Sequence, residues 1–193
     1  PHWNWEGHEG TEVPVFVYTS YPSAELFING KSFGKQTKHG ETPENRFRLM
    51  WPHAIYEPGE VKVVAYNQAG EPVAEKMIHT AGRPHHIELS TKRESLVSDG
   101  KDLAYVTLKI VDKDGRLCPQ DGRLVYFQVD GEGRFRAAAN GDPTCLDLFH
   151  LPQMHVFNGM LTLIVQSGKK EGYIKVKATS PGINAGMLQL KVK

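Results

Sequence analysis

The chain has 193 residues, of which 39% are hydrophobic and 23% charged, and its 23 Lys and Arg against 22 Asp and Glu leave a formal net charge of +1. This balance provides no broad basic surface, so nucleic acid is excluded as a partner. No apolar run approaches the about 20 residues of a membrane-spanning helix, so we expect no membrane insertion.

Short apolar runs in the first half alternate with period two and end at turn residues, a pattern typical of half-buried strands. They predict strands near residues 13–18, 24–28, 32–35, 46–51, 59–66 and 73–80. Between the second and third strands, Asn29-Gly30 supplies the two positive-φ positions of a type I′ hairpin turn. No segment of the chain predicts a helix.

The second half repeats this pattern and predicts strands near residues 86–91, 104–111, 125–130, 134–139, 159–165, 173–179 and 186–193. The clearest alternation places Ala104, Val106, Leu108 and Ile110 on one face of a strand. Six or seven short strands with turns at regular spacing are the signature of an immunoglobulin-like β-sandwich.

The segment between the halves combines a flexible Gly with a Pro that fixes φ, in Thr80-Ala81-Gly82-Arg83-Pro84. We therefore predict a domain boundary at about Gly82, with one domain over residues 1–82 and the other over 83–193. The predicted fold class is all-β, with two immunoglobulin-like β-sandwich domains in tandem.

Two stretches of the second half have turn chemistry. Asp112-Lys113-Asp114-Gly115 resembles the start of a calcium loop, but it lacks the closing Glu and is better interpreted as a hairpin turn. Asn140-Gly141-Asp142-Pro143 is also predicted to be a turn. The stretch from there to Asn158-Gly159 is long for a sandwich connection, which makes Asn140 and Asp142 candidate residues of a functional or interfacial loop.

The sequence contains no recognisable motif of a catalytic, phosphate-binding or metal site. The carboxylate pairs Glu6 with Glu9 and Asp142 with Asp147 fall in predicted loops and are better interpreted as solvated side chains than as a catalytic pair. We therefore assign no catalytic residue.

The nine histidines raise the question of a metal site. His85 and His86 start a predicted strand, where successive side chains point to opposite faces, so they are poorly placed to share an ion. His150 and His155 could meet, but no further ligand at suitable spacing completes a site. We expect no metal and no cofactor. Whether Cys118 and Cys145 form a disulfide or stay separate thiols is left open.

Trp3, Trp5 and Trp51 are the remaining candidates for a binding role, because an exposed indole offers a flat apolar face for a sugar ring. The alternative is that Trp51 packs inside the first sandwich while Trp3 and Trp5 cover an interface with another domain. Aromatic side chains more often fill cores and interfaces, which favours this alternative.

Several strings of the first half resemble the domain that follows the catalytic barrel in bacterial glycoside hydrolase family 2 enzymes of the β-galactosidase type. They are HWNWEG at 2–7, AELFINGKSFG at 24–34 and PGEVKVVAY at 58–66. The second half resembles the C-terminal immunoglobulin-like domain of the same enzymes through VSDGKDL at 97–103, VDKDG at 111–115, NGDP at 140–143 and FNG at 157–159. The part from Ser98 to Gly115 also resembles adhesin-type immunoglobulin domains.

The resemblance implies that this chain is a non-catalytic piece of an enzyme that removes terminal β-linked sugars with two glutamates on an upstream barrel. The start at Pro1, without an initiator Met, fits a segment that begins within a longer sequence. The implied partner is the catalytic barrel of the same polypeptide, with Trp3 and Trp5 as docking residues, and the implied location is periplasmic or at the cell surface. The sugar specificity stays open.

Four functions therefore compete. The first is an accessory role, in which the sandwiches buttress the barrel and shape its cleft or an oligomer contact. The second is a carbohydrate-binding module. The third is an adhesin-like protein interaction, which rests on the second half alone. The last is an enzyme in its own right.

Overall fold

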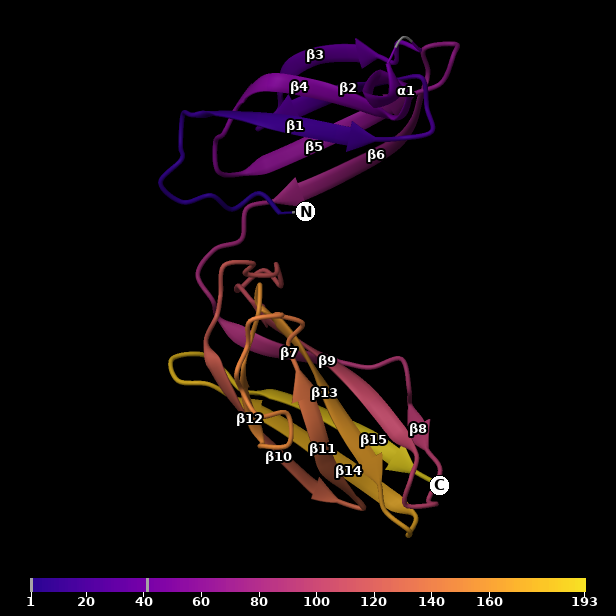
Figure 1. The fold of residues 1–193 in the computed structure, drawn as a ribbon, viewed down its shortest axis with the longest axis vertical. Coiled ribbons are helices and arrows are strands. Elements are labelled where there is room, and N and C mark those ends of the chain that lie inside the picture. The colour runs from indigo at the N-terminus through magenta and orange to yellow at the C-terminus, as the bar shows by residue number, and fades with distance from the viewer. Residues whose placement is uncertain (1, 41) are drawn as a thin grey trace. The chain divides into compact units, whose positions relative to one another are not determined.

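The computed structural model describes residues 2–40 and 42–193 and divides the chain into two compact units, Pro1–Thr80 and Ala81–Lys193 (Figure 1). Each unit is built from sheets whose strands are mainly antiparallel, so the predicted all-β class is confirmed. The predicted first domain, 1–82, includes Pro1 and Glu41, which lie outside the described residues. The boundary at about Gly82 and the immunoglobulin-like connectivity stay predictions.

Unit 1 contains a two-stranded sheet and a four-stranded sheet. The first pairs β1 (Glu12–Tyr18) with β4 (Arg48–Ile55), and the second runs in the order β3 (Lys31–Thr37), β2 (Ser23–Ile28), β5 (Glu60–Tyr66) and β6 (Pro72–His79). Asn29, at φ 49°, and Gly30, at φ 79°, connect β2 to β3, which confirms the two positive-φ positions of the predicted hairpin turn.

One short helix, α1 (Pro43–Phe47), precedes β4, so the predictions of a strand from residue 46 and of no helix are wrong here. The Thr42 side chain caps the helix by accepting a hydrogen bond of 3.3 Å from the backbone N–H of Asn45. This local capping outweighs the strand pattern for two residues, and β4 begins at Arg48. No helix within the described residues is long and apolar enough to cross a membrane.

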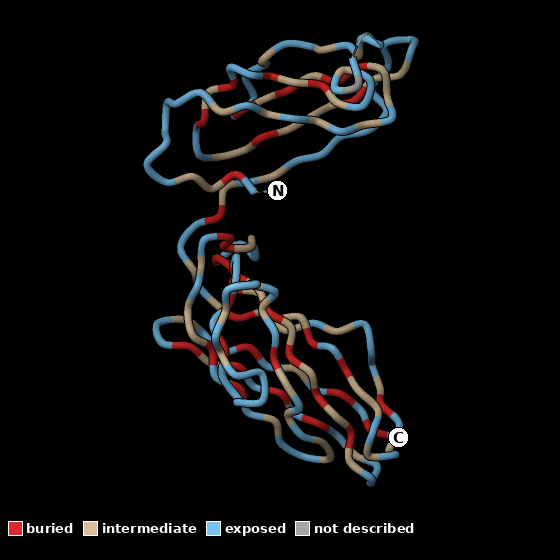
Figure 2. The backbone as a smooth tube through the Cα atoms, viewed as in Figure 1, coloured by how far each residue is buried: buried red, intermediate tan, exposed pale blue. Residues whose placement is uncertain are grey.

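The core of unit 1 is buried more completely on one side than on the other. Its buried side chains are Trp3, Ala24, Leu26, Ile28, Leu49, Trp51, Ala54, Tyr56, Val61 and Ala65. The inward-facing valines of β1 are only half-buried, and β6 is exposed along nearly its whole length (Figure 2). A two-stranded sheet spans only part of the width of a four-stranded one, so the β5–β6 side is left incompletely covered.

Unit 2 contains two larger sheets. One runs in the order β12 (Gln153–His155), β10 (Leu124–Gly131), β14 (Gly172–Thr179), β15 (Gly186–Val192) and β8 (Ser95–Leu96), and the other in the order β11 (Gly133–Ala139), β13 (Met160–Ser167), β9 (Leu103–Val111) and β7 (His86–Ser90). All neighbouring strands are antiparallel except β15 and β8. The short strands β8 and β12 were not predicted from the sequence.

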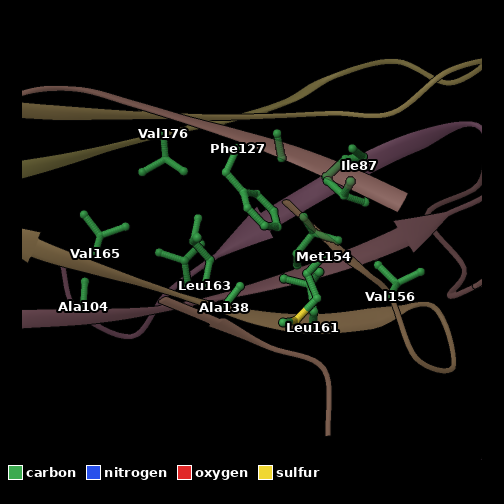
Figure 3. Close-up of a cluster of buried hydrophobic side chains, with 14 of the residues drawn as sticks. Ile87, Ala104, Phe127, Ala138, Met154, Val156, Leu161, Leu163, Val165 and Val176 are labelled. Carbon is green, nitrogen blue, oxygen red and sulfur yellow. The ribbon is translucent and has the colours of Figure 1, made fainter. Parts of the chain in front are cut away.

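The two sheets of unit 2 enclose a continuous apolar core. Val176 and Phe127 of the five-stranded sheet point toward Leu163 and Ala138 of the four-stranded sheet (Figure 3). The predicted inward face of β9 is confirmed, because its four alternate side chains are completely buried: Ala104, Val106, Leu108 and Ile110. The core of unit 2 is therefore covered on both faces by its own sheets, whereas the β5–β6 side of unit 1 is not.

Candidate docking sites

An aromatic cluster joins the first residues of the chain to the end of β4. The ring centroids of Trp3 and Tyr56 are 5.1 Å apart, and the Trp5 ring lies 5.2 Å from Trp3 and 5.5 Å from Tyr56. Trp3 Nε1 donates a hydrogen bond of 2.8 Å to the carbonyl of Glu57, and Trp5 N donates one of 3.0 Å to the Tyr56 hydroxyl. These bonds fix the segment to the sandwich.

The three candidate tryptophans have different surroundings. Trp3 is 3% exposed and Trp51 is 4% exposed, and Trp51 Nε1 also donates to the carbonyl of Gly34 at 2.9 Å. An indole buried in this way has no free face for a sugar ring or another domain. Trp5 is half-buried, so among these three side chains it offers the most surface for a partner.

A groove of about 640 Å³ opens in unit 1 beside this cluster. Its lining residues are His2, Trp3, Trp5, Pro14, Val15, Phe16, Val17, Tyr18, Thr19, Val61, Val63, Ala65, Ala74, Glu75, Lys76 and Ile78. Most of them are apolar, and they come from β1, β5, β6 and the first residues of the chain. Contiguous apolar surface of this kind is typical of an interaction site.

A second candidate lies in the long loop of unit 2, where the predicted turn is confirmed. Gly141 has φ 80°, Asp142 N donates to Asn140 Oδ1 at 3.0 Å, and Thr144 N donates to Asp142 Oδ1 at 2.8 Å. Asn140 and Asp142 therefore shape the entrance to the loop through bonds to its own backbone.

The same loop carries exposed apolar side chains on a fixed backbone. Leu146 is 93% exposed and Phe149 is 60% exposed. Asp147 Oδ2 accepts hydrogen bonds from the backbone N–H of His155 at 2.7 Å and from its ring Nδ1 at 2.9 Å. Both bonds lower the pKa of Asp147, and the bond from the backbone N–H has the larger effect.

Replacing Asp147 with alanine is expected to loosen this loop without unfolding unit 2. Losing a hydrogen bond to a charged group costs about 1.5–3 kcal/mol, which corresponds to at least a roughly tenfold larger open population. Chymotrypsin should then cleave faster after Leu148 or Phe149. Asp114→Ala, which removes a carboxylate on a different turn, is the control. Equal cleavage rates in both variants would contradict the role of the Asp147–His155 pair.

Three of the four carboxylates considered for a catalytic pair accept local hydrogen bonds: Glu9, Asp142 and Asp147. Glu9 Oε1 accepts from Gly7 N at 3.3 Å, and Asp142 and Asp147 accept the loop bonds described above. Glu9 and Asp142 thus bond to the backbone of their own turns, whereas Asp147 bonds across the loop to His155.

The structure corrects the expected placement of His85 and His86. Their Nδ1 atoms are 3.1 Å apart, because His85 precedes β7 and so does not follow the side-chain alternation of the strand. Within residues 2–40 and 42–193, however, no three His, Cys, Asp or Glu side chains form a group suited to hold a metal ion.

Both cysteines are free thiols. Burial, followed by the nearby charges of Asp112 and Asp121, raises the pKa of Cys118 to about 11. This thiol is therefore protonated at neutral pH and is unsuited to act as a nucleophile.

Asp112 is a buried carboxylate whose structural role the sequence did not reveal. It is 1% exposed and accepts backbone hydrogen bonds from Gly82, Asp114 and Arg116 at 2.8, 2.9 and 2.8 Å. The D-x-D-G pattern indicated a turn, but the bond to Gly82 joins residues 30 positions apart. Asp112 thus attaches the first residues of unit 2 to its β9 turn.

Two family descriptions match the chain. Residues 87–189 match glycoside hydrolase family 2 C-terminal domain 5, and residues 10–74 match a domain of unknown function, DUF4982. Among curated proteins, β-galactosidase BoGH2A of Bacteroides ovatus is 37% identical over the whole chain, which covers 22% of that protein. A β-glucuronidase of Formosa agariphila is 26% identical over 98% of the chain, which covers 19% of that protein.

Solved structures of glycosidases are also similar to the whole chain. A glycosyl hydrolase family 2 member from Bacteroides cellulosilyticus superposes on the whole chain with a TM-score of 0.94 and 33% identity, and a β-glycosidase from Bacteroides vulgatus does so with a TM-score of 0.89 and 28% identity. In both cases the chain covers 24% of the matched protein. It therefore spans only about a quarter of the length of these proteins.

Proposed function

Because the chain belongs to the glycoside hydrolase family 2 C-terminal domain 5 family, we propose that its two units are non-catalytic accessory domains of a longer glycosidase. In this proposal the longer protein hydrolyses terminal β-linked sugars. β-Galactosides are the first candidates, since the curated protein that is 37% identical is a β-galactosidase. The two units buttress its catalytic barrel and contribute no reacting group.

The apolar groove of unit 1 carries this proposal. Val63, Ala74 and Ile78 line it without being fully buried, although their side chains would be stabilised by removal from water. Covering the groove with another domain of the same polypeptide supplies that burial. Trp5, at the lining of the groove, is the docking residue, while Trp3 acts indirectly by holding the segment that carries Trp5.

A charge placed in the groove is expected to weaken docking. Ala74 lines the groove, whereas its exposed neighbour Val73 does not. In the intact protein, Ala74→Lys should cost at least about 2 kcal/mol of docking free energy, because an unpaired charge is buried in an apolar contact. The expected readouts are a lower melting temperature and lower glycosidase activity.

Val73→Lys is the matched control and should leave both readouts unchanged. In the 193-residue chain by itself the two variants should unfold alike, because the groove is open to water there. Unchanged stability and activity of the intact Ala74→Lys protein would refute docking through the groove.

The rival functions have direct tests. The purified chain should not turn over an aryl β-galactoside, and turnover would show that it is an enzyme in its own right. A carbohydrate-binding module would be retarded in a polysaccharide gel, whereas we expect no retardation. A periplasmic or cell-surface location of the longer protein stays a prediction from the family resemblance.

A further inference from the structure

We propose that the groove of unit 1 accepts a β-strand, supplied by the longer polypeptide outside residues 1–193, which pairs with the free edge of β1. This inference rests on the proposed accessory function and specifies how docking occurs. It replaces a general apolar contact with backbone hydrogen bonds of defined geometry, the recognition mode called β-augmentation.

The walls of the groove are strand edges. Six consecutive residues from Pro14 to Thr19 line it, although successive side chains of a strand point to opposite faces. A continuous run of this kind means that the edge of β1 itself, with its backbone N–H and C=O groups, faces the groove. Among the described residues β1 pairs only with β4, and β6 only with β5, so both walls have an unpaired edge.

The floor of the groove is an apolar surface on which the inward side chains of an added strand could pack. Val61, Val63 and Ala65 alternate along the inner face of β5 and line the groove. Facing them, Val15 and Val17 of β1 are only half-buried. A third strand beside β1 would lie over this floor and complete the two-stranded sheet, with every second side chain pointing inward.

The free edges of β1 and β6 differ in how well they could accept an added strand. The register of β6 pairs Lys76 with Val63, so Lys76 is on the inner face of an edge strand, a placement that discourages strand addition. β1 has Pro14 at its irregular start, but Val15 to Tyr18 contain no charge or proline. The incoming strand therefore pairs with β1 from Val15 onward.

The proposed source of the strand follows from the length of the family relatives. The chain covers 22% of the B. ovatus enzyme and 24% of the B. cellulosilyticus protein, so most of a comparable polypeptide lies elsewhere. A strand from the same polypeptide also has a high effective concentration at the groove, which favours pairing over capture of a second molecule.

Amide hydrogen exchange compares the intact protein with the 193-residue chain. Those amides from Val15 to Thr19 that are not bonded to β4 should exchange quickly in the chain alone and at least about 100-fold more slowly in the intact protein. The protected amides should alternate along β1, as a paired strand requires. β3, the opposite edge of the four-stranded sheet, is the internal control and should not change.

Each outcome decides a separate point. Alternating protection of β1 that is lost in intact Ala74→Lys but kept in Val73→Lys supports strand addition. If β1 stays unprotected while Ala74→Lys still lowers the melting temperature, the docking proposal survives and strand addition is overturned. If neither effect occurs, both proposals are rejected.

Discussion

Trp3→Ala is expected to destabilise unit 1 by about 3–5 kcal/mol, the usual cost of removing a large aromatic side chain from a core. The loss has two sources. The cavity removes the packing of Trp3 on Tyr56, and the carbonyl of Glu57 loses the indole donor at 2.8 Å. The segment that presents Trp5 at the groove would then come loose.

Denaturant unfolding followed by tryptophan fluorescence measures this effect in unit 1 alone. All three tryptophans lie in this unit, so their emission does not report on unit 2. Trp5→Ala, at a half-buried position of the same segment, should cost clearly less. If the two variants unfolded alike, or if Trp3→Ala matched the wild type, Trp3 would not be the core residue described above.

Asp112→Ala is the second large effect, expected to destabilise unit 2 by about 3 kcal/mol or more. Three backbone N–H groups, those of Gly82, Asp114 and Arg116, would lose their acceptor in a buried site. Calorimetry of the whole chain separates the unfolding of the two units once tryptophan fluorescence has identified that of unit 1. Asp114→Ala removes an exposed partner of Arg116 and should cost less than about 1 kcal/mol.

The acid dependence of unit 2 provides a further check on Asp112. Burial by itself would raise the pKa of this carboxyl, but the hydrogen bonds from the three backbone N–H groups outweigh it, so the folded pKa lies below the ordinary value of 3.8. The stabilisation is therefore present above pH 3.8 and is lost as the pH falls through the lower folded value. In Asp112→Asn, the free energy of unfolding of unit 2 should therefore fall less steeply as the pH is lowered. An unchanged pH dependence would contradict this role of the Asp112 carboxylate.

The sequence determined the features that depend on neighbouring residues. Alternation identified the inward face of β9, because the side-chain period of a strand is a local property. Turn chemistry located the positive-φ pair at Asn29 and Gly30 for the same reason. The pattern failed where elements are very short, because α1, β8 and β12 have too few residues to show a period.

The candidate site depended on tertiary structure. Whether Trp3 or Trp5 has a free face follows from Tyr56, about fifty positions along the chain, and the role of Asp112 follows from its bond to Gly82. The groove exists because two strands face four, and sheet membership is set by long-range pairing that periodicity does not encode. Local sequence thus determined the strands, whereas their assembly decided which apolar side chains were left for a partner.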